Sequence, residues 1–535
     1  MAKAKKVEEK INLDSILFKC RDILRAARNS GSFFEKRDMM LTLVFLRFIG
    51  EKFEDGIQKL RQDLIAQGLD PDDEEIFAAF FDDATFTDGT YNLPVEARWS
   101  TIINTPAPGL NVALDTALHS IATSSKQLKG CFVEGTFTTR NLAANDIKKI
   151  VDEVNKISHK AFGEEKDLVG RVYEYFLKEF AVNATKEEGE FYTPHDAVQL
   201  IAAMIEPFDG TLYDPCCGSG GMFVQSIKFV EAHSGNKKKV SIYGQEYTNT
   251  TFKLAKMNLA IRGIAANLGE MAANTFSNDQ HKDLKADFIM ANPPFNQKSW
   301  REYNELKDDP RWYGYDVPPT SNANYGWILN IVSKLSSNGV AGFLLANGAL
   351  SGDGIELNIR RQLLQNHLVE AIIILPRNMF YSTDISVTLW ILAGNRKART
   401  VEQNGKMVKY RYRENEVLFV DLRQWGEPFE KKYIQFSPEQ IADIAHNIHN
   451  WQREGYETTY QNIPEYCYSA SLDEIERKGW SLVPSKYIEF KSRDEGVDFD
   501  ARMRELQSEM RELLTQEEES KKDLKELFEK LGYSL

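Results

Sequence analysis

Short apolar segments alternate with helical segments from about residue 205 onward, and this alternation is the strongest constraint on the fold. It is typical of a doubly wound α/β domain with a largely parallel sheet. Val387–Leu392 and Val417–Asp421 add later strands, for which an antiparallel direction is one option. The other expected strands are Thr211–Tyr213, Val240–Tyr243, Asp287–Ala291, Ala341–Ala346 and Val369–Leu375, and the expected helices cover 221–233, 250–262, 325–336 and 357–366.

A glycine-rich turn, Asp214-Pro215-Cys216-Cys217-Gly218-Ser219-Gly220-Gly221, directly follows the first expected strand. Open α/β sheets bind ligands at the carboxyl ends of their strands. Glycines let the backbone pass close to a ligand, and the following helix offers unpaired N–H groups to a carboxylate. The turn does not match a phosphate-binding P-loop or the G-x-G-x-x-G pattern. By themselves, the glycines also fit an ordinary tight turn.

Glu246 ends the next expected strand and favours a nucleoside-bearing ligand. An acidic side chain in this position can accept hydrogen bonds from both ribose hydroxyls, as in dinucleotide folds. Taken alone, Glu246 would better fit a solvated surface residue. Together with the glycine turn, it indicates a cofactor site.

Asn292-Pro293-Pro294-Phe295 follows another apolar strand and indicates chemistry on an exocyclic amine. The lone pair of such an amine is delocalised into the ring, so acceptors for its N–H bonds would turn the nitrogen toward an electrophile. The Asn292 oxygen is one acceptor and the Pro293 carbonyl the other. Consecutive prolines restrict the backbone and aim that carbonyl, and Phe295 offers a face for stacking a base. The two loops together predict methyl transfer from S-adenosylmethionine (SAM) to adenine N6.

The two ends of the chain have helical patterning. Residues 1–160 are expected to form a helical N-terminal domain with an irregular stretch at 79–110. In the C-terminal tail, Met503, Leu506, Met510 and Leu513 have a/d-like spacing that Leu524, Leu527 and Leu531 resume after Glu517 and Ser520. This pattern fits either an amphipathic helical hairpin or a partner-binding helix.

Composition limits the class of protein. The net charge of −13 argues against a chain that wraps nucleic acid by electrostatics alone, so a partner is expected to neutralise much of the DNA phosphate charge. No apolar run approaches the length of a membrane span, and the N-terminus lacks the apolar region of a signal peptide. The five scattered cysteines predict neither a disulfide framework nor a metal site and fit a reducing cytoplasm.

These motifs resemble those of the modification (M) subunits of type I restriction–modification systems, which are N6-adenine DNA methyltransferases. The resemblance covers nearly the whole chain. It implies a doubly wound, Rossmann-like SAM-dependent methyltransferase domain at 161–480, with the helical domain at 1–160 and a C-terminal helical tail at 481–535. It also implies that the substrate is double-stranded DNA with a flipped adenine, since a paired base cannot reach such a pocket.

The resemblance extends the cofactor site. Gly189-Glu190-Phe191-Tyr192-Thr193-Pro194 looks like the family's first SAM-binding motif, with His195 at its border. By the same analogy Ser219, Gly220 and Gly221 contact SAM and Glu246 holds its ribose. The implied catalytic residues are Asn292, Pro293, Pro294 and Phe295, and the implied cofactor-binding residues are Glu190, Phe191, Tyr192, Thr193, Pro194, His195, Asp214, Gly218, Ser219, Gly220, Gly221 and Glu246.

The resemblance also implies partners. In this family, two M subunits bind one specificity (S) subunit that reads the DNA sequence, and restriction (R) subunits can join the complex. The C-terminal helices would dock on the S subunit, and the N-terminal domain would close over DNA.

Three segments have no settled role in the sequence. Asn274 lies where such enzymes often have an aspartate, so its contact with the cofactor adenine is open. Residues 296–320 mix basic and aromatic side chains, which fits either contact with nucleic acid or a plain surface loop. Residues 380–390 resemble a further family segment, but a buried strand with a turn is the preferred interpretation.

Other functions remain possible at this point. Glutamine-amide methyltransferases also use Asn-Pro-Pro-aromatic, although a small protein substrate needs neither terminal helical region. In N4-cytosine methyltransferases serine commonly replaces the asparagine, so Asn292 favours adenine. A SAM-binding scaffold without activity would not need an intact catalytic tetrapeptide.

Overall fold

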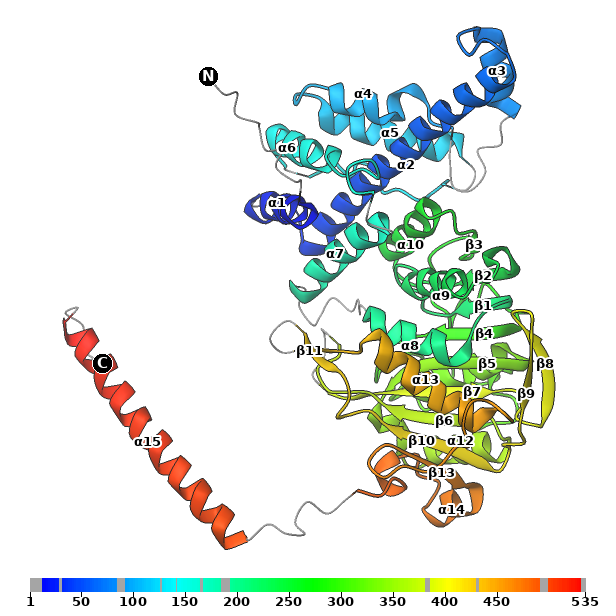
Figure 1. The fold of residues 1–535 in the computed structure, drawn as a ribbon, viewed down its shortest axis with the longest axis vertical. Helices are drawn as coiled ribbons and strands as arrows, with labels where there is room; N and C mark the ends of the chain where they lie inside the picture. The colour runs from blue at the N-terminus through cyan, green and yellow to red at the C-terminus, as the bar shows by residue number, and fades with distance from the viewer. Residues whose placement is uncertain are drawn as a thin grey trace.

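The structure is a computed structural model that describes residues 12–27, 31–83, 92–125, 128–140, 142–163, 167–183, 193–380, 385–429, 433–490 and 499–530. A helical N-terminal region lies beside a large sheet with helices on both faces, and a long helix lies near the C-terminus (Figure 1). Within the described segments, no helix has the length and apolar character needed to cross a membrane.

Capping residues set the starts of the first two helices. Asn12 accepts hydrogen bonds from the backbone N–H groups of Asp14 and Ser15. Ser32 and Glu35 form a capping box, in which each side chain bonds the backbone of the other residue. The N-terminal helices are α1 (Leu13–Ala26), α2 (Phe33–Ala66), α3 (Glu74–Asp83), α4 (Trp99–Asn104), α5 (Leu110–Ser124), α6 (Ala144–Asn155) and α7 (Leu168–Asn183).

Part of the stretch 79–110, where irregular structure was expected, is helical. The 3-10 turn Val95–Ala97 and helix α4 pack against α2 and α5. Trp99, the first residue of α4, is buried, and its indole N–H donates to the Asn155 side-chain oxygen over 2.7 Å. Tertiary burial of this large side chain therefore stabilises a helix that the local composition does not indicate.

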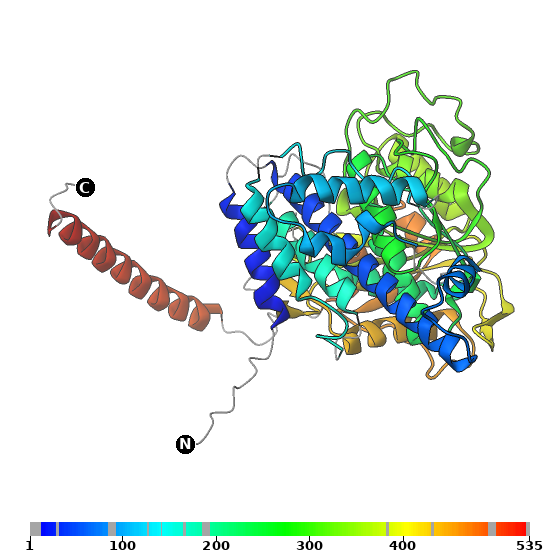
Figure 2. The ribbon, with the colours of Figure 1, turned by 90° about the horizontal axis from the view of Figure 1, so that it is seen from above.

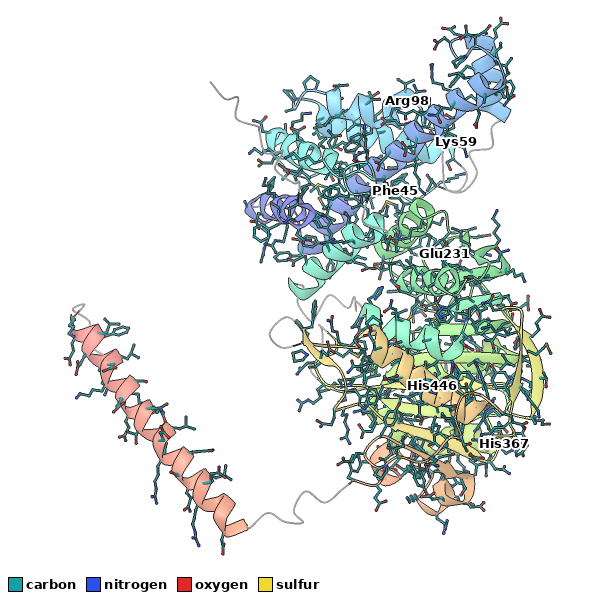
Figure 3. The ribbon with its side chains drawn as sticks, in the orientation of Figure 1. Phe45, Lys59, Arg98, Glu231, His367 and His446 are labelled. Atoms are coloured by element: carbon teal, nitrogen blue, oxygen red, sulfur yellow. The ribbon has the colours of Figure 1, made fainter. Side chains whose placement is uncertain are left out.

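Helix α10 (Asn249–Ile261) joins the N-terminal region to the sheet domain. Leu254, Met257 and Ile261 are buried in the same hydrophobic cluster as side chains of α1, α2 and α7, including Phe45, which Figure 3 marks. Helix α7 lies beyond the expected domain boundary at residue 160 but packs in this cluster. The Lys52 ammonium group also donates to the Ile261 carbonyl over 2.7 Å. The two regions therefore share a core.

The sheet has nine described strands in the order β13-β10-β6-β7-β5-β4-β1-β2-β3. Strands β1, β2, β3, β4 and β5 pair in parallel, β7 runs antiparallel between β5 and β6, and β10 pairs in parallel with β6. The strands are β1 (Gly210–Asp214), β2 (Val240–Gly244), β3 (Ala266–Asn267), β4 (Ala286–Ala291), β5 (Leu335–Ala346), β6 (Val369–Ile374), β7 (Val387–Ala393), β10 (Glu416–Asp421) and β13 (Cys467–Ser471).

Helices cover both faces of this sheet. Side chains of α8 (His195–Ile205), α9 (Gly221–Ala232), α10 and α13 (Pro438–Gln452) share one core with one face of the strands. Side chains of α11 (Asn324–Lys334), α12 (Ile355–Gln365) and α14 (Leu472–Arg477) share a second core with the other face. Two small hairpins, β8 (Arg399–Gln403) with β9 (Lys406–Tyr410) and β11 (Glu427–Phe429) with β12 (Tyr433–Gln435), lie outside the sheet.

The expected doubly wound α/β class is confirmed. Val387–Leu392 is antiparallel to both neighbouring strands, which is the direction that the sequence analysis offered as one option. The strand is buried throughout. Its burial supports the interpretation of residues 380–390 as a buried strand with a turn, as far as the described strand extends. Val417–Asp421 differs, because it pairs in parallel with β6 and antiparallel only with β13.

Helix α15 (Phe499–Lys530) corrects the hairpin interpretation of the C-terminal tail. It is one continuous helix, and Glu517 and Ser520 do not interrupt it. It lies apart from the rest of the described chain in both Figure 1 and Figure 2. Its apolar side chains are exposed, from 40% for Met503 to 61% for Leu513. The amphipathic pattern of the C-terminal tail therefore belongs to a single helix whose apolar face is exposed.

The shared core at α10 gives a first prediction. Met257→Glu would place a charge among buried side chains of both regions, so we expect the N-terminal region to separate from the sheet domain. Limited proteolysis should then cleave the variant faster than the native chain. Thr250→Glu adds the same charge at an exposed position of α10 and should leave the cleavage rate unchanged. Equal cleavage of the two variants would contradict the prediction.

Candidate functional site

The loops that carry the predicted motifs start from the same edge of the sheet. Strand β1 lies between β2 and β4 and is parallel to both. Carboxyl ends of parallel neighbours lie side by side, so the segments after Asp214, Gly244 and Ala291 converge. Residues that are about 80 positions apart in the sequence therefore meet in one place.

The glycine turn after β1 has the backbone conformation that its glycines permit. Gly218 and Gly220 have φ values of +53° and +81° in the left-handed region, and Gly220 is the N-cap of α9. A Cβ at Gly218 or Gly221 would meet no atom within 4 Å. The Asp214 carboxylate accepts a hydrogen bond from the Cys216 backbone N–H over 2.9 Å. The turn thus leaves open space above its backbone.

Glu246 connects this turn to the end of β2. Its carboxylate accepts hydrogen bonds from the backbone N–H groups of Gly218, over 3.0 Å, and Thr248, over 2.8 Å. From α10, the Asn258 amide donates to the Ser219 carbonyl over 2.7 Å. These bonds fix the turn from two neighbouring elements, so its open side is held in a defined position.

Asn292 has the free acceptor that amine chemistry needs. In the described orientation, its amide nitrogen donates to the Thr193 hydroxyl over 2.9 Å. Its side-chain oxygen Oδ1 is buried and has no hydrogen-bond partner among the described residues. An unpaired buried acceptor costs free energy, so its presence in a cavity wall indicates a donor from a ligand.

Two adjoining cavities contain most of the predicted residues. The larger has a volume of about 420 Å³ and includes Gly218, Ser219, Glu246, Asn292 and Pro294 in its wall. The smaller has a volume of about 100 Å³, and its wall shares Gly218, Ser219 and Asn292 with the larger cavity and adds Thr193, His195, Asp214 and Gly221. The glycine turn and the catalytic tetrapeptide therefore border one continuous site.

Some predicted residues lie outside these walls. Gly220 packs against Leu259, Pro293 is buried, and Pro194 is the N-cap residue of α8. Phe295 lies against Phe380, with ring centroids 6.4 Å apart. None of these four predicted residues lines either described cavity. Glu190, Phe191 and Tyr192 fall outside the described residues.

The sequence did not identify several wall residues. Helix α2 contributes Phe34 and Arg37, and α7 contributes Leu177, so the N-terminal region closes one side of the larger cavity. Gln297, Trp300 and Trp327 line another side, together with Phe276. The aromatic residues were visible in the sequence, but aromatic side chains at helical or loop positions usually belong to a core. The spacing of these aromatic residues in the sequence therefore did not indicate that they line a cavity.

Comparison with known proteins agrees with this architecture. A family model described as N-6 DNA Methylase matches residues 164–496, more than half of the chain, and an HsdM N-terminal domain model matches residues 13–154. The chain belongs to the type I restriction enzyme methylase subunits. The HindI methylase subunit of Haemophilus influenzae is 37% identical over 82% of this chain and 100% of that protein. The MjaIX methylase subunit of Methanocaldococcus jannaschii is 31% identical over 92% of this chain and 88% of that protein.

Solved structures show the same fold for this methylase subunit. A type I methyltransferase subunit from Streptococcus thermophilus superposes with a TM-score of 0.70 at 21% identity, covering 89% of this chain and 99% of that one. A modification subunit of a type I enzyme from Vibrio vulnificus gives 0.58 at 18% identity, covering 86% and 92%. The fold class and the family expected from the motifs are thus confirmed.

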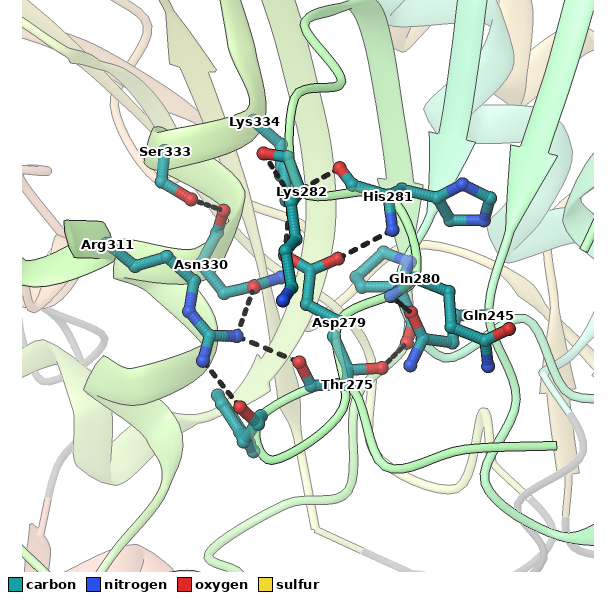
Figure 4. A network of polar contacts seen from close by, with 12 residues as sticks. Gln245, Thr275, Asp279, Gln280, His281, Lys282, Arg311, Asn330, Ser333 and Lys334 are labelled. Carbon is teal, nitrogen blue, oxygen red and sulfur yellow. Dashed lines mark hydrogen bonds and ion pairs between the residues drawn. The ribbon is translucent and has the colours of Figure 1, made fainter. Parts of the chain in front are cut away.

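A buried polar network fixes the loop that carries Thr275 and Phe276 in the cavity wall (Figure 4). The Arg311 guanidinium donates to the carbonyls of Thr275, over 2.8 Å, and Phe276, over 2.6 Å. The Lys334 ammonium pairs with Asp279 over 2.6 Å. These contacts connect α11 and the 296–320 segment to the wall of the site. The loop is consequently held rigid by satisfied charged groups.

The 296–320 segment therefore has a structural role in the wall of the site. Trp300, Arg301, Arg311 and Trp312 are buried, and the Arg301 guanidinium donates to backbone carbonyls, including that of Pro318 over 2.6 Å. Tyr313 is exposed. Four of the basic and aromatic side chains of this segment thus hold the loop together, whereas Lys298, Tyr303 and Lys307 are exposed like Tyr313.

Asn274 uses its side-chain oxygen within the same loop. The oxygen accepts hydrogen bonds from the backbone N–H groups of Phe276, over 2.8 Å, and Ser277, over 3.4 Å. Asn274 also lines the larger cavity. In this methylase subunit the oxygen is already bound by the backbone, which supports leaving Asn274 out of the core site.

Burial shifts the titration of several groups beside the glycine turn. It raises the pKa of the Asp214 carboxyl to about 7, against the opposing hydrogen bond from Cys216 and with a further increase from nearby Glu246. Burial also raises the pKa values of the Cys216 and Cys217 thiols well above their usual range, which disfavours thiolate chemistry. Across the described residues, no group of His, Cys, Asp and Glu is arranged to hold a metal ion.

The raised pKa of Asp214 gives a pH-dependent prediction. Between its ordinary pKa of 3.8 and its folded pKa of about 7, the folded state holds a proton that the unfolded state has lost. Stability therefore falls as the pH rises through this window. Asp214→Asn cannot titrate, so its melting temperature should fall less than that of the native chain between pH 5 and pH 8.

The control for this measurement is Asp209→Asn, which changes an exposed carboxyl near the start of β1. We expect its pH dependence to follow that of the native chain. If Asp214→Asn shows the same pH slope as the native chain, the buried carboxyl is not the group that titrates.

Proposed function

We propose that this chain is the methylation subunit of a type I restriction–modification complex and transfers a methyl group from SAM to adenine N6. The observation that carries the proposal is the Asn292 side-chain oxygen. It is buried, lacks a partner among the described residues and lines a cavity that also contains the glycine turn and Glu246. The match of residues 164–496 to the N-6 DNA methylase family also supports methyl transfer to an exocyclic amine of DNA.

The catalytic tetrapeptide acts on the amine as an acceptor. The Asn292 oxygen accepts one N–H of the exocyclic amine and turns the nitrogen lone pair out of conjugation toward the methyl donor. An aimed dipole in a dry pocket is effective because it needs no reorganisation during the reaction. The sequence assigned the second acceptor to the Pro293 carbonyl and the stacking face to Phe295, but neither residue lines either of the two described cavities. The base reaches this cavity by flipping out of the duplex.

The residues of the chain fit SAM. When bound, SAM supplies the methyl group from its sulfonium centre. The open space at Gly218 and Gly221 admits a ligand close to the backbone, and the start of α9 offers N–H groups to the cofactor's carboxylate. Glu246 lines the larger cavity and holds the ribose hydroxyls. Thr193, His195, Asp214 and Ser219 border the smaller cavity, which we assign to the methionine part of the cofactor. The resemblance assigns the segment from Glu190 to Pro194 to the same part of SAM.

The complex supplies what this chain lacks. A chain of net charge −13 does not bind DNA strongly by itself, so a separate S subunit selects the DNA site and two M subunits bind each S subunit. R subunits join the full complex, which works in the cytoplasm. The exposed apolar face of α15 docks on the helical part of the S subunit, and the N-terminal region closes over DNA.

The direct test is transfer of labelled methyl groups from SAM to plasmid DNA, followed by nucleoside analysis. The chain is assayed alone and after co-expression with an S subunit. N6-methyladenine that forms only with the partner is the expected result. N4-methylcytosine, or label on protein alone, would replace the proposed substrate. Methylation by the isolated chain would refute the division of labour between subunits.

Asn292→Ala should abolish transfer by removing the acceptor. We expect the rate constant in the complex to fall by about 100- to 1,000-fold, the usual effect of deleting one aimed polar group. The affinity for SAM, measured by calorimetry, should remain nearly unchanged because the lost oxygen faces the amine. A variant that turns over at the native rate would exclude the acceptor role.

Helix α15 gives a separate prediction on assembly. Leu513→Glu places a charge on the exposed apolar face and should weaken binding to the S subunit in size-exclusion chromatography. Ser508→Glu adds the same charge on the opposite side of the helix and should assemble normally. Since both residues lie on a helix apart from the globular region, neither change should alter its melting temperature. Normal assembly of Leu513→Glu would show that another surface carries the interaction.

A further inference from the structure

Three residues in the wall of the larger cavity each carry a buried polar atom without a hydrogen-bond partner among the described residues. These atoms are Asn292 Oδ1, Gln297 Oε1 and Trp327 Nε1. Two are acceptors and one is a donor. An exocyclic amine beside a ring nitrogen has the complementary set, two N–H donors and one acceptor. The cavity wall therefore matches the amine edge of a nucleobase.

The backbone at Gln297 is held in place. Asn296 precedes it with a φ of +52°, a left-handed conformation that asparagine adopts more readily than most residues with a side chain. The Asn296 backbone N–H donates to the Asn324 oxygen over 3.0 Å, and the Asn324 amide donates back to the Asn296 side-chain oxygen over 2.9 Å. The Ala323 N–H donates to the Gln297 carbonyl over 2.9 Å. The start of α11 thus holds the turn from which Gln297 reaches the cavity wall.

Aromatic packing keeps this part of the wall rigid. The Phe276 ring lies 4.4 Å from that of Trp300 and 4.3 Å from that of Trp327, measured between centroids. A Cβ at Gly326 would lie 2.9 Å from the Trp300 ring, so the ring packs directly on the α11 backbone. The position of Trp327 is consequently fixed before a ligand binds.

We propose that Gln297 contacts the target base and is a second side-chain acceptor for its amine, beside Asn292. This inference rests on the proposed function and deepens it. Gln297 lines the same cavity as Asn292, whereas Pro293 lines neither described cavity. Gln297 also belongs to the loop that carries the catalytic tetrapeptide, which favours the target base over the adenine of the cofactor. With both acceptors in place, a base that carries a carbonyl in place of the amine is rejected.

The test compares Gln297→Ala and Gln297→Glu in the complex with the S subunit. Single-turnover methyl transfer is measured at saturating SAM on DNA that contains the recognised site. Loss of one specific base contact corresponds to about a 10- to 100-fold decrease in kcat/KM for DNA, which we expect for Gln297→Ala. Gln297→Glu keeps an acceptor oxygen and should retain more activity. Gln365→Ala, at an exposed position of α12, is the matched control and should behave as the native complex.

Stability and cofactor binding separate a base contact from a structural role. Gln297 Oε1 makes no hydrogen bond among the described residues, so Gln297→Ala removes an unpaired buried acceptor and should not lower the melting temperature. Calorimetric affinity for SAM should stay unchanged. A lower melting temperature that parallels the loss of activity would show a structural role and overturn the inference. Weaker SAM binding with an unchanged KM for DNA would assign Gln297 to the cofactor's adenine and also overturn it.

The native complex in the same assay distinguishes the proposed role of Gln297 from the proposed function of the chain. Native activity on adenine N6 with an equally active Gln297→Ala variant would overturn only the role of Gln297. No N6-methyladenine from the native complex would overturn the proposed function and, with it, this inference.

Discussion

Parallel pairing of β1 with β2 on one side and β4 on the other is the constraint on which the whole site depends. The pairing places Asp214 beside Gly244, so the glycine turn and the loop of Glu246 begin at the same level of the sheet. The Glu246 carboxylate then bonds the Gly218 N–H across that gap. Strand β4 lies on the other side of β1 and ends directly before Asn292, which lines the cavity. Two motifs that the sequence separates thereby form the wall of one cavity.

The N-terminal region is part of the site and not an attachment to it. Helix α10 has side chains in the hydrophobic core of the N-terminal region and in the core on one face of the sheet. It therefore fixes the position of the N-terminal region against the sheet domain. Phe34 and Arg37 consequently reach the cavity from a helix that is remote in sequence. A cofactor bound beside the glycine turn would touch both regions. The wall of this cavity is therefore built from both regions.

Polar groups around the cavity divide into two kinds. Arg311 and Lys334 are buried, bind carboxylates and carbonyls, and hold the wall loop in place. The oxygens of Asn292 and Gln297 lack partners among the described residues and line the cavity. The first kind contributes rigidity, and the second costs stability until a ligand binds. This division is what a preorganised site requires, because the acceptors must be aimed before the amine arrives.

The sequence by itself determined the alternation of strands β1, β2, β4, β5, β6, β7 and β10 with helices, the glycine turn and the Asn-Pro-Pro-Phe motif, because these depend on local periodicity and on backbone restrictions of Gly and Pro. It did not determine that α15 is one helix, since a/d spacing with two polar interruptions fits a hairpin equally well. Nor did it indicate that Phe34, Gln297 and Trp327 line one cavity, because this arises from contacts between distant elements. Only the tertiary structure decided which polar atoms stay unpaired, because hydrogen bonding depends on all the neighbours that folding brings together.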